Sequence, residues 1–134
     1  MKILIAALLV GHALIHVSYL TPAPAPTVGG PAWPFNLTSS WLVTGVGINA
    51  DAVASMGRLL VGATVVALVL AGLATIGLLP VAWWPILAAT GAGLSLATLL
   101  LFFHPWLVLG IAIDALLLWA TLVVGWSPFG NMGG

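Results

Sequence analysis

The scarcity of charge is the feature that most limits what this chain can fold into. Its 134 residues include two basic and two acidic side chains, Lys2, Arg58, Asp51 and Asp114. A soluble domain carries charge on about a quarter of its residues because its surface must face water. Here 63% of the residues are hydrophobic. We therefore expect an integral membrane protein whose surface mostly faces lipid.

Charge and cysteine content exclude several classes of function. The formal net charge is zero, and no basic stripe is present that could neutralise the phosphates of a nucleic acid. Cysteine is absent, so the chain cannot form disulfides, provide a thiolate nucleophile or hold an iron–sulfur cluster on its own. The abundance of Ala, Gly, Val and Leu beside a single Lys is typical of a GC-rich prokaryotic genome. We therefore expect the prokaryotic inner (cytoplasmic) membrane.

Four apolar stretches predict an all-α membrane protein, a four-transmembrane-helix bundle forming a single domain over residues 1–134. The predicted helices cover approximately residues 3–20, 51–79, 82–103 and 105–126. At about 1.5 Å per residue the first stretch is roughly 27 Å long, enough to cross a bilayer. With Lys2 before it, this stretch could also be a signal peptide. Its two histidines and the absence of a clean cleavage site favour a retained helix.

A long loop rich in proline and tryptophan separates the first two helices. Its prolines forbid a continuous helix over residues 21–50; they are Pro22, Pro24, Pro26, Pro31 and Pro34. Most tryptophans of the chain lie near predicted helix ends, where indole rings favour the headgroup layer. The predicted interfacial anchors are Trp33, Trp41, Trp83, Trp84, Trp106 and Trp126.

Small residues at helical spacing predict close packing between helices, because they let two backbones approach. The predicted packing positions are Ala63, Ala67 and Ala71 in the second helix, Ala89 and Gly93 in the third, and Gly110 in the fourth. Short connections make the second, third and fourth helices antiparallel neighbours. We expect both termini on the cytoplasmic side with Lys2, although one basic residue at each side provides almost no orientation signal.

The candidate site combines His12 and His16 with Asp114. The two histidines are four residues apart and therefore share one helix face. From the helical rise, His12 lies roughly 13 Å along the first helix and Asp114 roughly 15 Å along the fourth, so both lie near the middle of a core about 30 Å thick. A carboxylate at that depth is costly and by default indicates a functional site.

Several chemistries fit these three residues. Two histidines and one carboxylate suit a divalent metal such as iron(II), zinc or manganese. Haem would need one of them together with His104 or a partner subunit, and quinone or lipid binding is a further option. The alternative is an interhelical hydrogen bond without chemistry, worth about 0.6–2 kcal/mol. His104 and Tyr19 are secondary candidates, although their positions favour a turn-capping role for His104 and an interfacial anchor role for Tyr19.

The layout resembles that of the DoxX-like small membrane proteins. The shared features are four helices, a histidine late in the first, a long first loop, and a second helix ending in the Gly77-Leu78-Leu79-Pro80 break. The usual acidic residue of the second helix and the basic residues around the first are missing here. The resemblance implies a quinone-linked redox accessory subunit, and no catalytic activity is carried over from it.

Three functions follow as hypotheses. The first is a small subunit of a larger membrane assembly, redox or energy-converting, that binds quinone, metal or haem near the histidines and Asp114. The second is a purely structural subunit, and the third is a small oligomeric proton-coupled transporter. The small-residue faces and the lack of a soluble domain favour a chain that works with other membrane subunits or as a homo-oligomer, and not as an enzyme on its own.

Overall fold

The protein is a bundle of helices. A computed structural model describes residues 1–25, 28–30, 32–38 and 40–130, and over these ranges it contains helices and no strands. The main helices are α1 (Lys2–Val17), α2 (Ala50–Thr75), α3 (Trp84–Leu101) and α4 (Val108–Leu118). Shorter turns extend or precede them: η1 (Ser18–Leu20), η2 (Thr44–Val46), η3 (Val81–Trp83), η4 (Pro105–Leu107) and the π-helical η5 (Trp119–Val123). Four of the resulting spans are long and apolar enough to cross a membrane, which confirms the predicted helical class.

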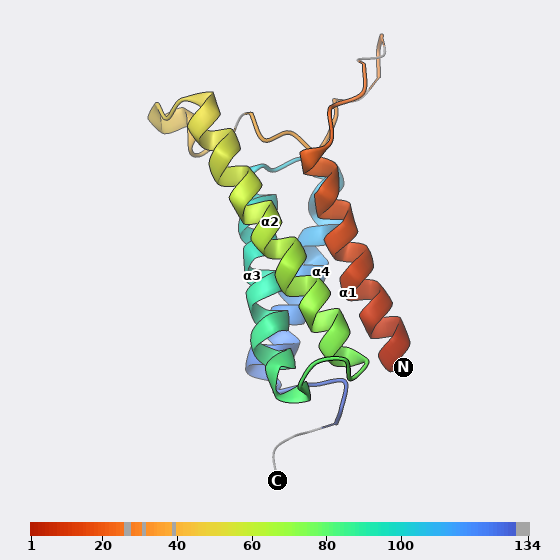
Figure 1. Ribbon diagram of the computed structural model, residues 1–134. Coiled ribbons are helices and arrows are strands. Elements are labelled where there is room, and N and C mark those ends of the chain that lie inside the picture. The colour runs from red at the N-terminus through yellow and green to blue at the C-terminus, as the bar shows by residue number, and fades with distance from the viewer. Residues whose placement is uncertain (26–27, 31, 39, 131–134) are drawn as a thin grey trace.

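The helices run alternately up and down, so both termini lie at one end and the long loop at the other (Figure 1). Each helix packs against the next in the chain, α1 on α2, α2 on α3 and α3 on α4. Over the described residues, direct backbone contact between α1 and α4 is sparse by comparison. The bundle is therefore closed along three sides and has a seam between its first and last helices.

The helix ends differ from the predicted ones because local capping stops the helices early. Asn49 begins α2 as expected, with its side-chain oxygen accepting from the Ala52 N–H at 2.8 Å. The helix ends at Thr75 rather than near residue 79, because Gly77 adopts a φ of +83°. The N–H groups of Gly77 and Leu78 then bond back to carbonyls of the last turn, which terminates the helix in a Schellman arrangement.

The third and fourth helices are also shorter than predicted. Regular helix α3 stops at Leu101 rather than at residue 103, and the fourth span ends with η5 at Val123 rather than at residue 126. Past η5, Gly125 has a φ of +67°, and the Trp126 N–H bonds back to the Ala120 carbonyl at 2.9 Å. The end of the fourth span is therefore followed by a chain reversal at Gly125 that the hydropathy pattern does not mark.

The helix faces that pack together agree only in part with those predicted. Ala67 and Ala71 are buried, whereas Ala63 lies on the exposed side of α2. In α3 the predicted Ala89 and Gly93 are partly exposed, and no atom lies within 4 Å of a Cβ built on Gly93. The buried face of α3 consists of Trp84, Ala88, Gly91, Ala92, Ser95, Thr98 and Leu99. The small residues of α3 identified from sequence therefore lie beside the contact and not within it.

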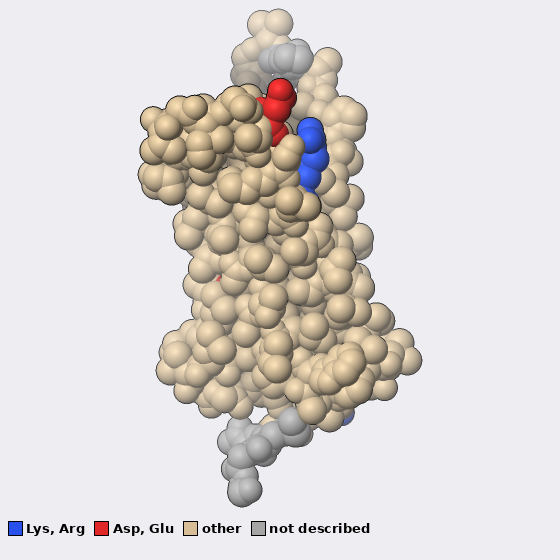
Figure 2. Space-filling view, turned by 60° about the vertical axis from the view of Figure 1, so that its left-hand side comes forward, with Lys and Arg blue, Asp and Glu red and all other residues tan. Residues whose placement is uncertain are grey.

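The outer surface is apolar around the bundle. Leu59, Leu100, Leu109 and Leu122 are among the large hydrophobic side chains that are exposed. In Figure 2 the acidic and basic side chains on the visible face gather near one end, and the broad surface below them is almost free of charge. Such a surface suits lipid and not water.

The long loop closes one end of α3. Ser40 Oγ donates to the Leu101 carbonyl and Trp41 Nε1 donates to the Leu100 carbonyl, both at 2.6 Å. The last carbonyls of a helix have no partner within it, so these bonds satisfy α3 at its C-terminal end. The predicted irregular backbone of the loop agrees with the residues described, while Pro26 and Pro31 lie outside the described ranges.

Candidate functional site

The three predicted site residues meet inside the bundle. His12 and His16 lie on α1 and Asp114 on α4, and all are buried, with Asp114 at 0% exposure. One nitrogen or oxygen from each lies within 4.8 Å of the others. His12 Nε2 is 2.9 Å from Asp114 Oδ1. His12 and Asp114, which the helical rise places at the same depth, are thus in direct contact.

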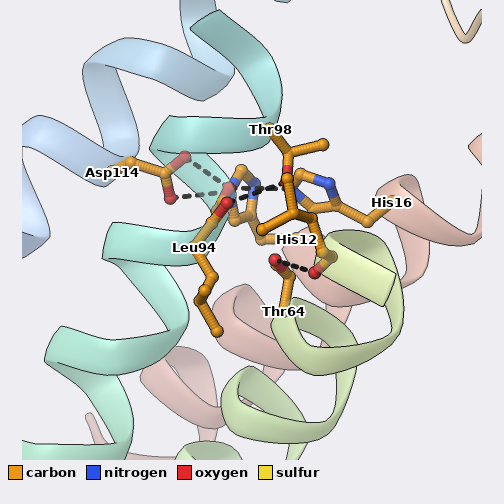
Figure 3. Close-up of polar contacts among 8 residues, drawn as sticks. His12, His16, Thr64, Leu94, Thr98 and Asp114 are labelled. Atoms are coloured by element: carbon orange, nitrogen blue, oxygen red, sulfur yellow. Dashed lines mark hydrogen bonds and ion pairs between the residues drawn. The ribbon is translucent and has the colours of Figure 1, made fainter. Parts of the chain in front are cut away.

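Ser95 of α3 is the hub of this cluster, and no pattern in the sequence distinguished it from the other hydroxyl residues. Its hydroxyl oxygen lies 2.7 Å from His16 Nε2 and 3.1 Å from His12 Nε2, and its proton is donated to Asp114 Oδ2. Figure 3 shows His12 and His16 of α1 and Asp114 of α4 pointing toward one another. Ser95 therefore connects the two histidines with the carboxylate.

One set of protons accounts for the hydrogen bonds among these side chains and leaves His16 Nδ1 as a buried acceptor without a described partner. Ser95 has a single proton, which goes to Asp114, so its lone pairs accept from the imidazole N–H of His16. His12 then donates its Nε2–H to the other oxygen of Asp114. The carboxylate accepts two hydrogen bonds, and both imidazoles carry a proton on Nε2. Such pairing is what allows a carboxyl group to be buried at all.

Other buried hydroxyls in the helices behave differently. Thr64, Thr75, Thr98 and Thr121 each return their hydroxyl to the carbonyl four residues earlier, at 2.6–2.8 Å. Figure 3 shows this local arrangement at Thr64 and at Thr98 beside Leu94. A hydroxyl bonded to its own helix needs no tertiary partner. Ser95 bonds across helices instead, which distinguishes it from the threonines; residue type alone does not predict this.

The same geometry bears on metal binding. His12, His16 and Asp114 are a suitable set of ligands for one divalent ion. Nitrogen and oxygen ligands lie about 2.0–2.2 Å from zinc. Here the two nitrogens and the carboxylate converge on the Ser95 oxygen, so this hydroxyl occupies the point where an ion would lie. In this arrangement the site is a hydrogen-bonded cluster.

A groove follows the seam between α1 and α4. Its larger part has a volume of about 400 Å³ and apolar walls, formed by Leu8 and Leu9 on one side and Leu116, Leu117 and Trp119 on the other, among others. A smaller pocket of about 160 Å³ lies toward the long loop, where Phe35 and Trp106 form part of its wall. His12 lines both. The buried cluster is thus reached from the lateral surface of the bundle.

Aromatic rings continue from the cluster toward the loop. His16 stacks on Tyr19 with ring centroids 6.1 Å apart, and Tyr19 meets Phe35 edge-on at 5.2 Å. Trp33 lies 5.3 Å from Phe35. Among the described residues, three buried polar atoms lack a hydrogen-bond partner, and all are on this row: His16 Nδ1, Tyr19 Oη and Trp33 Nε1.

Gly110 lets α4 approach this region. A Cβ on Gly110 would lie 2.9 Å from Leu99 Cδ1 and 3.6 Å from His12 Cε1. His104, in contrast, is not part of the cluster. Its Nδ1 accepts from the Trp106 N–H at 3.2 Å and begins η4, the turn-capping role considered above.

The predicted interfacial tryptophans fall into three groups. Trp41, Trp83 and Trp106 are exposed, and Trp33 and Trp126 are partly buried. Trp84 is fully buried, where it packs edge-on against Trp126 and donates to Thr75 Oγ1 at 2.9 Å. Position near a helix end therefore did not separate Trp84, which packs in the core, from residues suited to an interface.

Comparisons of the chain with known protein families, curated proteins and solved structures found no match. The resemblance in layout to the DoxX-like proteins therefore stays a prediction from the sequence.

Proposed function

We propose that this protein is a small membrane subunit that takes a lipid-soluble ligand of the quinone class from the bilayer into the seam between α1 and α4. One observation carries the proposal: His12 bonds to Asp114 at 2.9 Å and also lines the apolar groove. A group that belongs both to a buried polar cluster and to the wall of a lateral opening is suited to meet the polar headgroup of a lipid-soluble ligand.

The groove supports entry from lipid. Its walls are apolar side chains, and the seam faces the same surface as the exposed leucines of α1 and α4. A pocket with apolar walls and a few convergent polar groups is the usual form of a small-molecule site. A hydrocarbon tail in such a groove exchanges one apolar environment for another, so the polar headgroup decides where the ligand stops.

The cluster supports a ligand that gains and loses protons. Histidine is the side chain that proteins most often use for proton transfer. In the described structure His12 connects through Asp114 and Ser95 to His16, so a proton taken at one imidazole can be redistributed along hydrogen bonds. Quinones and their reduced forms exchange protons at ring oxygens, which this arrangement can serve.

A role within a larger assembly is part of the proposal. The chain consists of four spans with one loop of about thirty residues and offers little surface outside a bilayer. We place it in a prokaryotic cytoplasmic membrane, where other subunits would supply the electron transfer that quinone chemistry requires.

Tryptophan fluorescence tests the proposal. Trp119 and Trp126 line the groove, and quinones quench indole emission. Decylubiquinone added to the protein in lipid nanodiscs should quench saturably. Ala120→Trp places a large side chain in the groove and should abolish saturable binding. Because the added tryptophan changes the fluorescence of the protein, binding to this variant is measured by displacement of a labelled quinone. Ala112→Trp is the matched control, since Ala112 is exposed in the same membrane span and does not line the groove. Equal binding by both variants would rule out the groove.

A divalent metal is the second candidate, because the three ligand atoms lie within 4.8 Å of one another. Metal binding requires the Ser95 hydroxyl to turn away from the point at which the three ligand atoms converge. Cobalt(II) titration distinguishes a metal site from a hydrogen-bonded cluster. Tetrahedral d–d bands that appear in the native protein and disappear in His16→Ala would establish a metal site. A spectrum that stays unchanged up to excess cobalt leaves the hydrogen-bonded cluster as the functional form.

A further inference from the structure

We infer that the pocket at the loop end of the seam is the headgroup subsite, and that Tyr19 Oη donates a hydrogen bond there to a carbonyl oxygen of the ligand. The inference rests on the proposed function and adds which residue recognises the ligand and which chemical group is recognised. Tyr19, His12 and His16 all line this pocket.

The hydroxyl of Tyr19 is the first argument. Tyr19 is 6% exposed, and its Oη has no hydrogen-bond partner among the described residues. A buried hydroxyl without a partner is destabilising, and buried side-chain polar atoms in proteins nearly always have one. His16, stacked against Tyr19, has a second buried atom without a described partner, Nδ1. Two such atoms beside one pocket indicate that its natural content is polar.

The direction of the missing hydrogen bonds is the second argument. Of the two atoms without a described partner beside the pocket, Tyr19 Oη can donate, whereas His16 Nδ1 carries no proton in the arrangement given above and can only accept. The Tyr19 hydroxyl therefore needs an acceptor. An oxygen with lone pairs and no need of a counter-charge, as in a carbonyl group, meets that requirement.

Shape is the third argument. The pocket of about 160 Å³ is lined by the aromatic side chains of Phe35 and Trp106. Aromatic faces favour a flat ring between them. Through His12 this pocket adjoins the apolar groove of about 400 Å³. A ring in the pocket would therefore direct its hydrocarbon chain along the seam toward Trp119 and Trp126.

Charge separates this ligand from a phospholipid. In the described part of the chain, no Lys, Arg, Asp or Glu side chain lines the pocket. A phosphate group placed there would be desolvated without a Lys or Arg partner and close to the Asp114 carboxylate that bonds to His12, at a large cost. The neutral ring of a quinone carries no such cost, so the subsite favours a neutral carbonyl-bearing headgroup.

Tyr19→Phe tests the inference, because it removes the hydroxyl and keeps the ring that stacks on His16. The measurement is the affinity for decylubiquinone in nanodiscs, by tryptophan quenching, and for decylbenzene, a tail and ring without carbonyl groups, by competition. Loss of one net hydrogen bond should weaken decylubiquinone binding about fivefold to tenfold. Decylbenzene binding should be unchanged. The ligand-free variant should be at least as thermally stable as the native protein, since it no longer buries an unpaired hydroxyl.

Each other outcome has a defined meaning. An equal loss for both probes would assign Tyr19 to ring packing and overturn the inference. Unchanged affinity for both, while Ala120→Trp still blocks binding, would overturn the inference and leave the proposed function in place. Native protein that binds no decylubiquinone would overturn both.

A second measurement needs no variant. Infrared difference spectra of decylubiquinone labelled with carbon-13 at its carbonyl groups report hydrogen bonding directly in the native protein. A downshifted carbonyl band relative to the free quinone in lipid is expected. A band at the free position would overturn the inference even if Tyr19→Phe failed to fold.

Discussion

His12 Nε2 lies 2.9 Å from Asp114 Oδ1, and this bond joins α1 to α4 across the seam where the two helices make little backbone contact. The most polar interaction of the bundle therefore lies where its apolar packing is weakest. Because His12 lines the groove, the cluster can be reached from the lateral surface. Because His12 bonds to Asp114, the cluster also helps to hold α1 and α4 together. Substitutions in the cluster and in the groove separate these two roles.

Ser95→Ala should destabilise the protein by about 1–3 kcal/mol. The substitution leaves His16 Nε2 without its acceptor and Asp114 with one donor fewer, and unsatisfied buried polar groups carry a cost of this size. Thermal unfolding in detergent measures the effect. Ser55→Ala, at an exposed position of α2, is the matched control and should change little. Equal stability of the two variants would show that Ser95 is not the hub.

Asp114→Asn and His12→Ala should be energetically coupled. An amide can no longer accept from both His12 and Ser95, so either change weakens the same bond. Double-mutant cycles across membrane helices give about 0.6 kcal/mol on average and up to about 1.7. We expect a coupling at the upper end of that range, from unfolding in detergent. The cycle of Asp114→Asn with Ser55→Ala should be additive, and equal coupling in the two cycles would contradict the contact.

Gly91→Ala should separate α2 from α3. A Cβ at this position would lie 2.7 Å from Leu68 Cδ2 and 3.1 Å from the Leu68 backbone nitrogen, and backbone cannot move aside easily. Overpacking of this kind costs about 1–3 kcal/mol. Gly93→Ala, one position outside the contact with no atom within 4 Å, is the matched control and should be tolerated. The difference in melting temperature between the two variants is the measurement, and the reverse order would place the packing face elsewhere.

A bound quinone should stabilise the fold. At about 100 times its dissociation constant, a ligand that binds only the folded state adds about 2.7 kcal/mol. Decylubiquinone should therefore raise the melting temperature of the native protein and of Ala112→Trp. Ala120→Trp, with its groove filled, should show no rise. A rise of equal size in all three would indicate a general effect of the quinone on the detergent or lipid.

Much of the fold and three of the four residues of the cluster followed from the sequence. The hydropathy of the four stretches predicted four helical spans, and the structure has them. Equal depth along antiparallel helices predicted that His12 and Asp114 lie at one level, where they bond. The helix ends at Thr75 and Leu101 were not predictable in the same way, because a turn at Gly77 and side chains of the distant loop decide them.

Rotation of the helices was the information that the sequence lacked. In a soluble protein the apolar face of a helix identifies the core, but beside lipid both faces are apolar. For that reason Ala89 and Gly93 were as plausible a packing face as Ala88 and Ala92, and only the latter are buried. The same ambiguity hid Ser95 among several hydroxyl residues of the spans.

The sequence by itself determined what lies at each depth, because charge scarcity, span length and the fixed rise of a helix act along the chain. Only the tertiary structure decided which side chains face one another, since that depends on rotation and packing between helices. It turned Ser95 toward the histidines, buried Trp84 and left a groove beside His12. A cluster that the sequence placed at one level thus became a connected site with an opening on its side.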